Sequence, residues 1–362
     1  MPRRPDRAQR RTDRERPPRP TLRENLWYWA KAIVAILILR AFIGEPFRIP
    51  SESMEDTLLV GDFLIVSKLH WGPRTPSTIG IPFTPIYVPG LRFPQVRLPG
   101  FSEPHRGDVV VFNYPAGVDV VRGEIPASVP IERRAPYIKR LVGLPGDTLA
   151  VLDKVLHING RPVPLAPTMK QRWTVAAVGQ TLPSARQLDD LGVQLLYGTS
   201  RIQDSTFVYE VYATPPEVEQ LRSLADVAGV EPSLLPEEYV DQTYGANPDH
   251  VPPRVIPAKG MTIPLNGRTL PVYAEAITRH EGHTLSQSGG QILLDGQPAT
   301  SYTFAQDYYM GMGDFRDNSV DSRYWGFIPE SHLVGKAILT FFSFKQWIPP
   351  IPRLNRFFRP IP

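Results

Sequence analysis

The sequence contains no cysteine, and this absence is the first constraint on its chemistry. Disulfide bonds, zinc sites built from thiolates and cysteine nucleophiles are therefore excluded. Lysine is scarce, with eight residues among 362. The seven histidines form no HExxH pattern or other evident metal spacing, and no G-x-S-x-G motif accompanies them. We therefore expect no metal, no cofactor and no catalytic triad that depends on histidine.

Net positive charge is lacking over the chain as a whole once its first twenty residues are set aside. The first twenty residues hold eight arginines against Asp6, Asp13 and Glu15, which gives +5, whereas the whole chain carries +4. The remainder is therefore about neutral. This distribution indicates a basic tail rather than a basic surface, so we do not expect nucleic acid as a partner. We predict that residues 1–21 form a disordered cytoplasmic tail.

One long apolar run occurs, over residues 26–44. At about 1.5 Å per residue, a helix of this length spans roughly the hydrocarbon layer of a bilayer. Lys31 and Arg40 interrupt the run, but each lies within about two turns of an end and can extend to the headgroups. We predict an uncleaved transmembrane helix over residues 22–44. The alternative is a cleavable signal peptide, which is disfavoured because no A-x-A pattern follows.

The arginine cluster also predicts the orientation of this helix. Because positive charge stays on the cytoplasmic side, the N-terminus is expected in the cytoplasm. Everything after Gly44 is then on the outer face of the cytoplasmic membrane, and the lipid bilayer is the first expected partner.

Beyond the helix, the turn signals indicate a mainly β protein. Gly-Asp pairs precede three short runs rich in β-branched residues, and an Asn-Gly and an Asp-Gly pair are typical of two-residue hairpins. These five pairs lie at residues 61–62, 107–108, 146–147, 159–160 and 295–296. Forty-one prolines leave little room for long helices.

A stretch over residues 165–286 is richer in polar residues and poorer in strand signals. Thr214-Pro215-Pro216-Glu217 combines an N-cap, a proline at the first helical position and a capping-box glutamate, and a second helix is predicted over residues 271–280. We interpret residues 165–286 as an inserted α+β subdomain.

This insertion leaves a β domain in two halves, residues 45–164 and 287–344. Residues 345–362 remain as a C-terminal tail in which aromatic and basic residues mix. That composition is compatible with contact to a membrane. A solvated tail is an equally open alternative.

Three segments carry the polar residues of chemical interest, residues 45–68, 136–149 and 312–329. Taken singly, they are a serine-rich loop, a strand with a solvated Lys139-Arg140 pair and a charged turn. Together, in this order and after a membrane helix, they resemble the bacterial type I signal peptidase (leader peptidase) family. The resemblance extends to about residue 344, apart from the insertion, and implies an antiparallel β catalytic domain.

The resemblance implies a serine protease with a Ser/Lys dyad. The family motif P-S-x-S-M-x-x-T-L aligns with residues 50–58, which makes Ser53 the nucleophile and the Ser51 hydroxyl an oxyanion donor beside the Ser53 amide. The segment Tyr-Ile-Lys-Arg makes Lys139 the general base. The motif G-D-x-R-D-N-S-x-D-S-R makes Ser319 the hydroxyl that orients this base.

The other polar residues of the last motif are implied to be structural. Asp314 would pair with Arg140, and Asp321 with Arg323. These pairs would hold the strand of Lys139 against the loop that carries Ser319.

The implied chemistry is physically reasonable. Where no histidine is available, a neutral lysine amine can activate a serine hydroxyl. At its usual pKa of about 10.4, lysine is neutral only about once in 2,500 molecules at pH 7, so the site must lower the pKa. Burial does this, and a shift of roughly 2 to 3 units costs about 3 to 4 kcal/mol. Lys139 lies in an apolar segment that suits such burial.

The family also implies the substrate, namely preproteins whose signal peptides end in small residues. The peptide would add as a strand between residues 47–49 and 137–138. Candidate pocket residues are Phe47, Ile49, Met54, Leu58, Tyr137 and Ile138. A role for these six as ordinary core residues stays open, and the protein translocation machinery is a further candidate partner.

Three residues depart from the family pattern. Glu52 replaces a usual glycine, Asp56 a usual proline and Phe315 a usual asparagine. Glu52 would be strained if its position needs a positive φ, and its charge would lie near the oxyanion. An alternative function is therefore a catalytically impaired, membrane-tethered binding homologue. A self-cleaving repressor of the related Ser-Lys fold is disfavoured because an anchor, and no DNA-binding helix, precedes the domain.

Overall fold

The computed structural model divides the chain into two units, residues 1–40 and 41–362. The described residues are 21–80, 87–88, 90–119, 122–178, 184–196, 200–203 and 206–362. In the first unit lies most of α1 (Leu22–Phe42), a helix with no buried residue, long and apolar enough to cross a membrane. This helix coincides with the predicted membrane segment. The predicted basic tail lies outside the described residues, except for Thr21.

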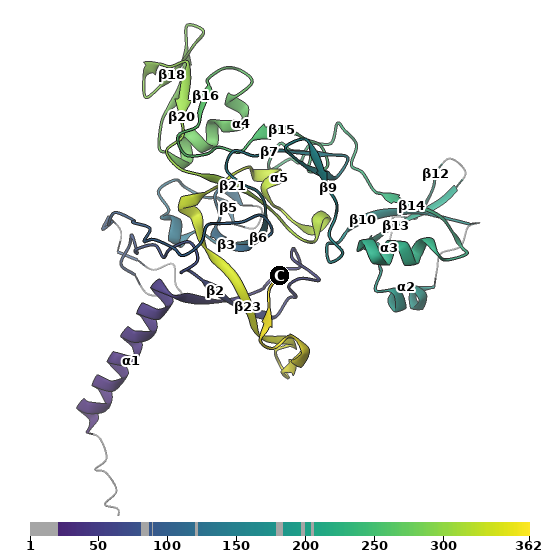
Figure 1. Cartoon of the computed structure of the whole chain (residues 1–362), viewed down its shortest axis with the longest axis horizontal. Coiled ribbons are helices and arrows are strands. Elements are labelled where there is room, and N and C mark those ends of the chain that lie inside the picture. Colours follow the sequence, from purple (N-terminus) through teal and green to yellow (C-terminus); the bar gives the residue numbers. More distant parts are fainter. Residues whose placement is uncertain are drawn as a thin grey trace, which may run out of the picture. The chain divides into compact units, whose positions relative to one another are not determined.

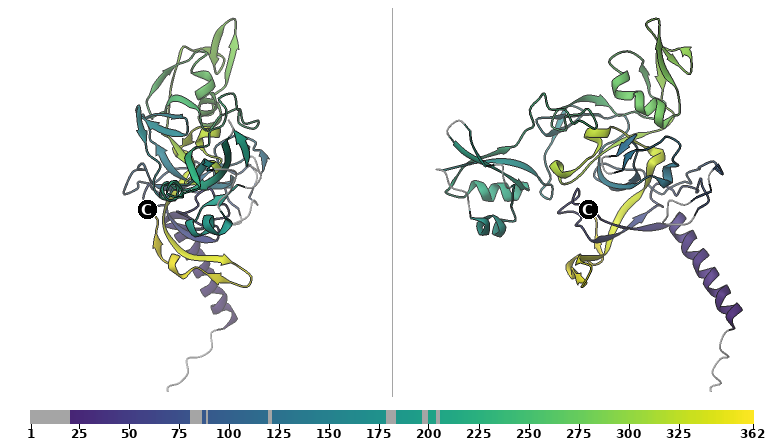
Figure 2. Two further views of the ribbon diagram at one scale, coloured as in Figure 1. Left: turned by 90° about the vertical axis from the view of Figure 1, so that its right-hand side faces the viewer. Right: turned by 180° about the vertical axis from the view of Figure 1, so that it is seen from behind.

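The second unit is built on an antiparallel sheet (Figure 1). In the described part of the chain nine strands belong to it, in the order β1-β2-β23-β3-β6-β21-β22, with β24 and β25 also paired to β23. Their bounds are β1 (Gly44–Arg48), β2 (Asp62–Ser67), β3 (Val109–Asn113), β6 (Pro136–Gly143), β21 (Tyr308–Met312), β22 (Ile328–Pro329), β23 (Leu333–Gln346), β24 (Ile351–Pro352) and β25 (Arg359–Pro360). The long β23 crosses this sheet as a bent ribbon (Figure 2). The mainly β fold predicted from the sequence is confirmed.

Smaller sheets flank the main one. Their strands are β4 (Val118–Asp119) with β5 (Gly123–Glu124), β7 (Thr148–Leu152) with β8 (Val155–Ile158), β9 (Arg161–Val163) and β15 (Val251–Val255), β16 (Thr262–Pro264) with β20 (Ser301–Thr303), and β17 (Leu285–Ser288) with β18 (Gln291–Leu294) and β19 (Gln297–Pro298). The predicted turns are present, since β3 and β7 each follow a Gly-Asp pair directly and β2 begins at the aspartate of such a pair. The two predicted hairpin pairs connect β8 to β9 and β18 to β19, with positive φ at both of their central residues.

Residues 171–232 form a separate module with its own core. Its elements are β10 (Gln171–Ala177), α2 (Ala185–Leu191), β11 (Gln194–Leu195), β12 (Arg201–Gln203), β13 (Thr206–Ala213), α3 (Pro215–Arg222) and β14 (Val227–Pro232). The sheet order β11-β13-β10-β14, with β12 extending along β13, gives the βαββαβ topology of ferredoxin-like folds. Both helices lie on one face of the sheet (Figures 1 and 2), and we call residues 171–232 the βαββαβ module.

The helix predicted from the capping signal is α3, where the Glu217 carboxylate accepts a hydrogen bond of 2.7 Å from the Thr214 amide. The second predicted helix is α4 (Leu270–Glu275), continued by a π-helical turn over Ala276–His280.

The rest of the predicted insertion packs elsewhere. Val251, Ile256 and Tyr273 share a core with Leu149 of β7 and Phe304. The stretch over residues 165–286, predicted to be one subdomain, is therefore divided between the βαββαβ module and the core beneath β7. Polar composition marks such a stretch as different from its surroundings, but it does not say which core each apolar residue joins.

The C-terminal residues 345–362, which we separated as a tail, pack on the main sheet through β24 and β25. Arg356 is buried and forms an ion pair of 2.5 Å with Asp62. Its guanidinium also donates a hydrogen bond of 2.9 Å to the carbonyl of Thr57. Through Arg356, the C-terminal segment is thus bonded to the loop that bears Ser53 and to the strand that follows it.

Candidate active site

Ser53 and Lys139 meet in the second unit although 85 residues separate them in the sequence. Lys139 lies in the middle of β6, opposite Val110 of β3, and Ser53 lies in the turns that follow β1. The Nζ atom of Lys139 donates a hydrogen bond of 2.8 Å to Ser53 Oγ. Both residues are buried, with 3% of Lys139 and 9% of Ser53 exposed.

Burial changes the protonation of Lys139. Loss of solvation lowers the pKa of its ammonium to about 8, while Asp321 opposes the decrease, Arg323 adds to it and Asp314 opposes it. The nearby charges thus act in both directions, and desolvation decides the result. At pH 7 a pKa of 8 leaves about one lysine in ten neutral, against about one in 2,500 for free lysine.

The third motif, G-D-x-R-D-N-S-x-D-S-R over residues 313–323, contributes a buried ion pair close to Ser53 and Lys139. The Asp321 carboxylate contacts Arg323 at 2.9 Å and accepts hydrogen bonds of 2.8 Å from Ser319 Oγ and 3.0 Å from the Gly313 amide. At position 313 a Cβ atom would lie 2.3 Å from Ser319 Oγ and 2.5 Å from the Ser53 carbonyl oxygen. Only glycine fits there. Because no side chain intervenes at this position, Ser319 can lie beside the loop of Ser53, and its hydroxyl is hydrogen-bonded to Asp321.

A second ion pair connects β6 to the same motif. The guanidinium of Arg140 binds the Asp314 carboxylate through two hydrogen bonds of 2.9 and 2.7 Å. Thr57 Oγ1 donates a bond of 2.6 Å to the same carboxylate, so the nucleophile motif and the third motif are joined at Asp314. We did not identify Thr57 from the sequence as a site residue, although its place in the P-S-x-S-M-x-x-T-L motif was a signal that it has a fixed partner.

The loop around Ser53 carries the candidate oxyanion donors. Among the described residues, no partner is found for the Ser53 amide, and Ser51 is exposed. Glu52 is also exposed, its φ is not positive, and its carboxylate accepts a hydrogen bond of 3.1 Å from Asn318 Nδ2. The strain considered for Glu52 is absent. Positive φ occurs instead at Asp56, with φ 71°.

The six candidate pocket residues divide into different environments. Ile49, Met54 and Leu58 are almost fully buried in one core cluster, against which Phe47 and Ile138 pack. Tyr137 belongs to the opposite side of β6, and its hydroxyl donates a bond of 2.9 Å to Asp119. For Ile49, Met54 and Leu58 the structure thus shows the core environment that the sequence left open.

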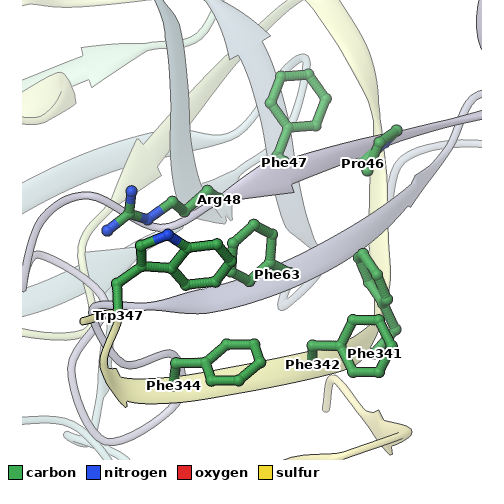
Figure 3. A pocket seen from close by; sticks show the side chains of 8 residues that line it. All are labelled: Pro46, Phe47, Arg48, Phe63, Phe341, Phe342, Phe344 and Trp347. Carbon is green, nitrogen blue, oxygen red and sulfur yellow. The ribbon is translucent and has the colours of Figure 1, made fainter. Parts of the chain in front are cut away.

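Phe47 also lines a groove on the main sheet, but Ser53 and Lys139 do not (Figure 3). The groove is walled by Pro46, Phe47, Arg48, Phe63, Phe341, Phe342, Phe344 and Trp347. It is therefore an aromatic surface of the sheet and not the catalytic cleft.

Two strand edges remain open near the dyad. β1 pairs with β2 along one edge only, and β6 pairs with β3 over residues 136–140 but with β21 only from Arg140 onward. Within the described residues, both β1 and the first half of β6 therefore have backbone groups without strand partners. A peptide in extended conformation can bind to such edges.

Comparison with known proteins identifies the family of the chain. The family model for signal peptidase, peptidase S26, matches residues 22–206 and 250–342. The unmatched residues 207–249 contain α3, β14 and most of β13 of the βαββαβ module.

Proteins called signal peptidase I are similar over most of the chain. That of Buchnera aphidicola (from Acyrthosiphon pisum) is 29% identical over 332 residues, 89% of this chain and 77% of the relative. Those of Pseudomonas aeruginosa and Haemophilus influenzae are each 26% identical, over 90% and 91% of this chain and 73% of each relative. The chain belongs to the signal peptidase family, peptidase S26, and is a serine endopeptidase.

Proposed function

We propose that this peptidase removes signal peptides from translocated preproteins with Ser53 as nucleophile and Lys139 as general base. The observation that carries the proposal is the hydrogen bond of 2.8 Å between the buried Lys139 amine and the Ser53 hydroxyl. A lysine in this place needs a lowered pKa to act as a base, and burial lowers it.

The geometry supports a two-step reaction. The neutral amine of Lys139 takes the proton of Ser53 Oγ as this oxygen attacks the carbonyl carbon of the scissile bond. The Ser53 amide, with the Ser51 hydroxyl as second donor, holds the developing oxyanion, and each such donor is typically worth about 3 to 4 kcal/mol. Lys139 then passes the proton to the departing amine, which leaves an ester on Ser53. The same base activates a water molecule that hydrolyses the ester.

The substrate would bind in extended form to the open edges of β1 and β6. Main-chain hydrogen bonds to these edges give affinity that is independent of sequence, which suits signal peptides of varied sequence. Cleavage after small residues follows if the pockets beside Ile138 are shallow. Ile49, Met54 and Leu58 would then act by filling the floor beneath the substrate, since they are buried.

The location follows from the N-terminal segment. With α1 in the cytoplasmic membrane and the arginine cluster in the cytoplasm, the catalytic domain is on the outer face. Signal peptides emerge there, and confinement to the same membrane raises the rate of encounter. The protein translocation machinery and the bilayer are then natural partners.

The alternative of a catalytically impaired binding homologue loses its main support. It rested on strain and misplaced charge at Glu52. In the structure this residue is unstrained, and its carboxylate is engaged by Asn318.

The first prediction concerns cleavage of a preprotein by the purified full-length protein in detergent. Replacing the nucleophile (Ser53→Ala) or the base (Lys139→Ala) should lower kcat by at least about 10³-fold, because either change removes the attacking pair. The exposed Lys259→Ala serves as matched control and should retain full activity. Near-normal turnover by either dyad variant would show that the assignment is wrong.

A chelator belongs in the same assay. In the described part of the chain, no group of three or more His, Asp or Glu side chains is arranged to hold a metal ion. We expect no effect of EDTA on the rate, and inhibition would point to a metal mechanism instead.

The second prediction concerns pH. Since the folded protein lowers the pKa of Lys139 to about 8, the neutral base accumulates as pH rises through 8. The value of kcat should rise about tenfold between pH 7 and pH 9 and then level off. A rate that keeps rising steeply beyond pH 9 would indicate a solvated lysine or a different base.

The third prediction concerns orientation, and the absence of cysteine makes it simple to test. Single cysteines placed at Ala8 and at the exposed Ser288 can be treated, in intact spheroplasts, with a maleimide that does not cross membranes. Ser288→Cys should react at once, and Ala8→Cys only after permeabilisation. The reverse pattern would contradict the proposed topology.

A further inference from the structure

The βαββαβ module touches the catalytic loops through the residue just before its first strand. The backbone amide of Lys170 donates a hydrogen bond of 3.0 Å to the Asp314 carbonyl, and its own carbonyl accepts one of 2.8 Å from the Arg316 amide. These two bonds lie on either side of Phe315 and form a parallel bridge to it. The module is therefore fixed to the third motif by main-chain bonds.

The side chain of Lys170 reaches the nucleophile loop. Only 6% of this residue is exposed, and its Nζ atom lies 3.3 Å from Asp56 Oδ2 and 5.5 Å from the centre of the Phe315 ring. A buried ammonium needs such partners, because desolvation without them is costly. Lys170 thus bridges Asp56, three residues after Ser53, to the third motif.

The two bridged loops also meet at the nucleophile itself. The Phe315 amide donates a hydrogen bond of 3.1 Å to the Ser53 carbonyl. At Gly313 there is no space for a side chain between Ser53 and Ser319. A displacement of Phe315 would therefore move the backbone that holds Ser53 relative to β6.

Two departures from the family pattern lie at this contact. Asp56 stands where proline is usual and has φ 71°, which proline, with φ near −65°, cannot adopt but aspartate tolerates. Phe315 stands where asparagine is usual, is buried, and packs edge-on against Tyr212 of the module, with 4.7 Å between ring centres. Asp56 and Phe315 both contact Lys170, so a change at Lys170 would act on the nucleophile loop and on the third motif.

We propose that Lys170 is a positioning residue through which the βαββαβ module sets the separation of Ser53 from Lys139. The inference rests on the proposed function, because it assigns to Lys170 the geometry of that dyad. Lys170 touches neither the dyad nor the open strand edges. It acts through Asp56 and Phe315, so it should affect kcat and leave substrate binding unchanged.

The test is a double-mutant cycle on the full-length protein in detergent, with a preprotein as substrate. Lys170→Met removes the charge and keeps the length, and Asp56→Asn removes the opposite charge with a residue that tolerates positive φ. Each should lower kcat about tenfold, because small displacements at a reacting centre have effects of this order or larger. KM should stay within about twofold, and Lys259→Met is the matched control.

The cycle separates coupling from general damage. If the pair acts as a unit, the double variant should lose about tenfold in kcat, as each single variant does, with melting temperatures within about 5 °C of wild type. Should Lys170→Met fail to fold, Asp56→Asn alone must still show the loss in kcat at unchanged KM.

Two outcomes would overturn the inference. One is that both single variants keep kcat within about twofold of wild type, and the other is that their losses multiply to about a hundredfold, as for independent sites. These outcomes leave the dyad intact, provided that Ser53→Ala is inactive. Activity of Ser53→Ala would instead refute the proposed function itself.

Discussion

The proposed catalytic geometry depends on the burial of one amine. Lys139 lies in β6 opposite Val110 of β3, and its only described side-chain hydrogen bond is to Ser53. Lowering its pKa from 10.5 to about 8 corresponds to a net destabilisation of the ammonium by about 3 kcal/mol, in which desolvation is the largest cause. The rest of the fold must offset this cost, which is a common exchange of stability for activity at functional sites.

The ion pairs around the dyad show how the fold offsets it. The pair of Arg323 with Asp321 is buried, and the half-buried Arg140 binds the buried Asp314, so the two pairs hold β6 and the third motif together. Arg356 adds a third pair beneath the nucleophile loop. Such pairs are costly to break singly, which makes them suitable as rigid supports.

The sequence predicted the local features well. Turns, hairpins and the capped helix α3 follow from residues close together in the chain. Three motifs, each continuous in the sequence, also pointed to Ser53, Lys139 and the loop that carries Ser319. Contacts between distant segments were not predictable in this way. Nothing local shows that Lys170 would be buried against Asp56, that Phe315 would pack on the module, or that Arg356 would reach Asp62. Each of these contacts depends on how parts of the chain that are distant in the sequence pack against one another.

The central claim is that the fold makes Lys139 a base near neutral pH, and titration of the amine by NMR tests it most directly. With eight lysines, isotope labelling of lysine side chains gives few signals, and the one missing from Lys139→Met identifies the residue. We predict that this signal titrates near pH 8, more than two units below the usual value of about 10.4 for a free lysine side chain. A Lys139 signal that titrates at the free-lysine value would contradict the account.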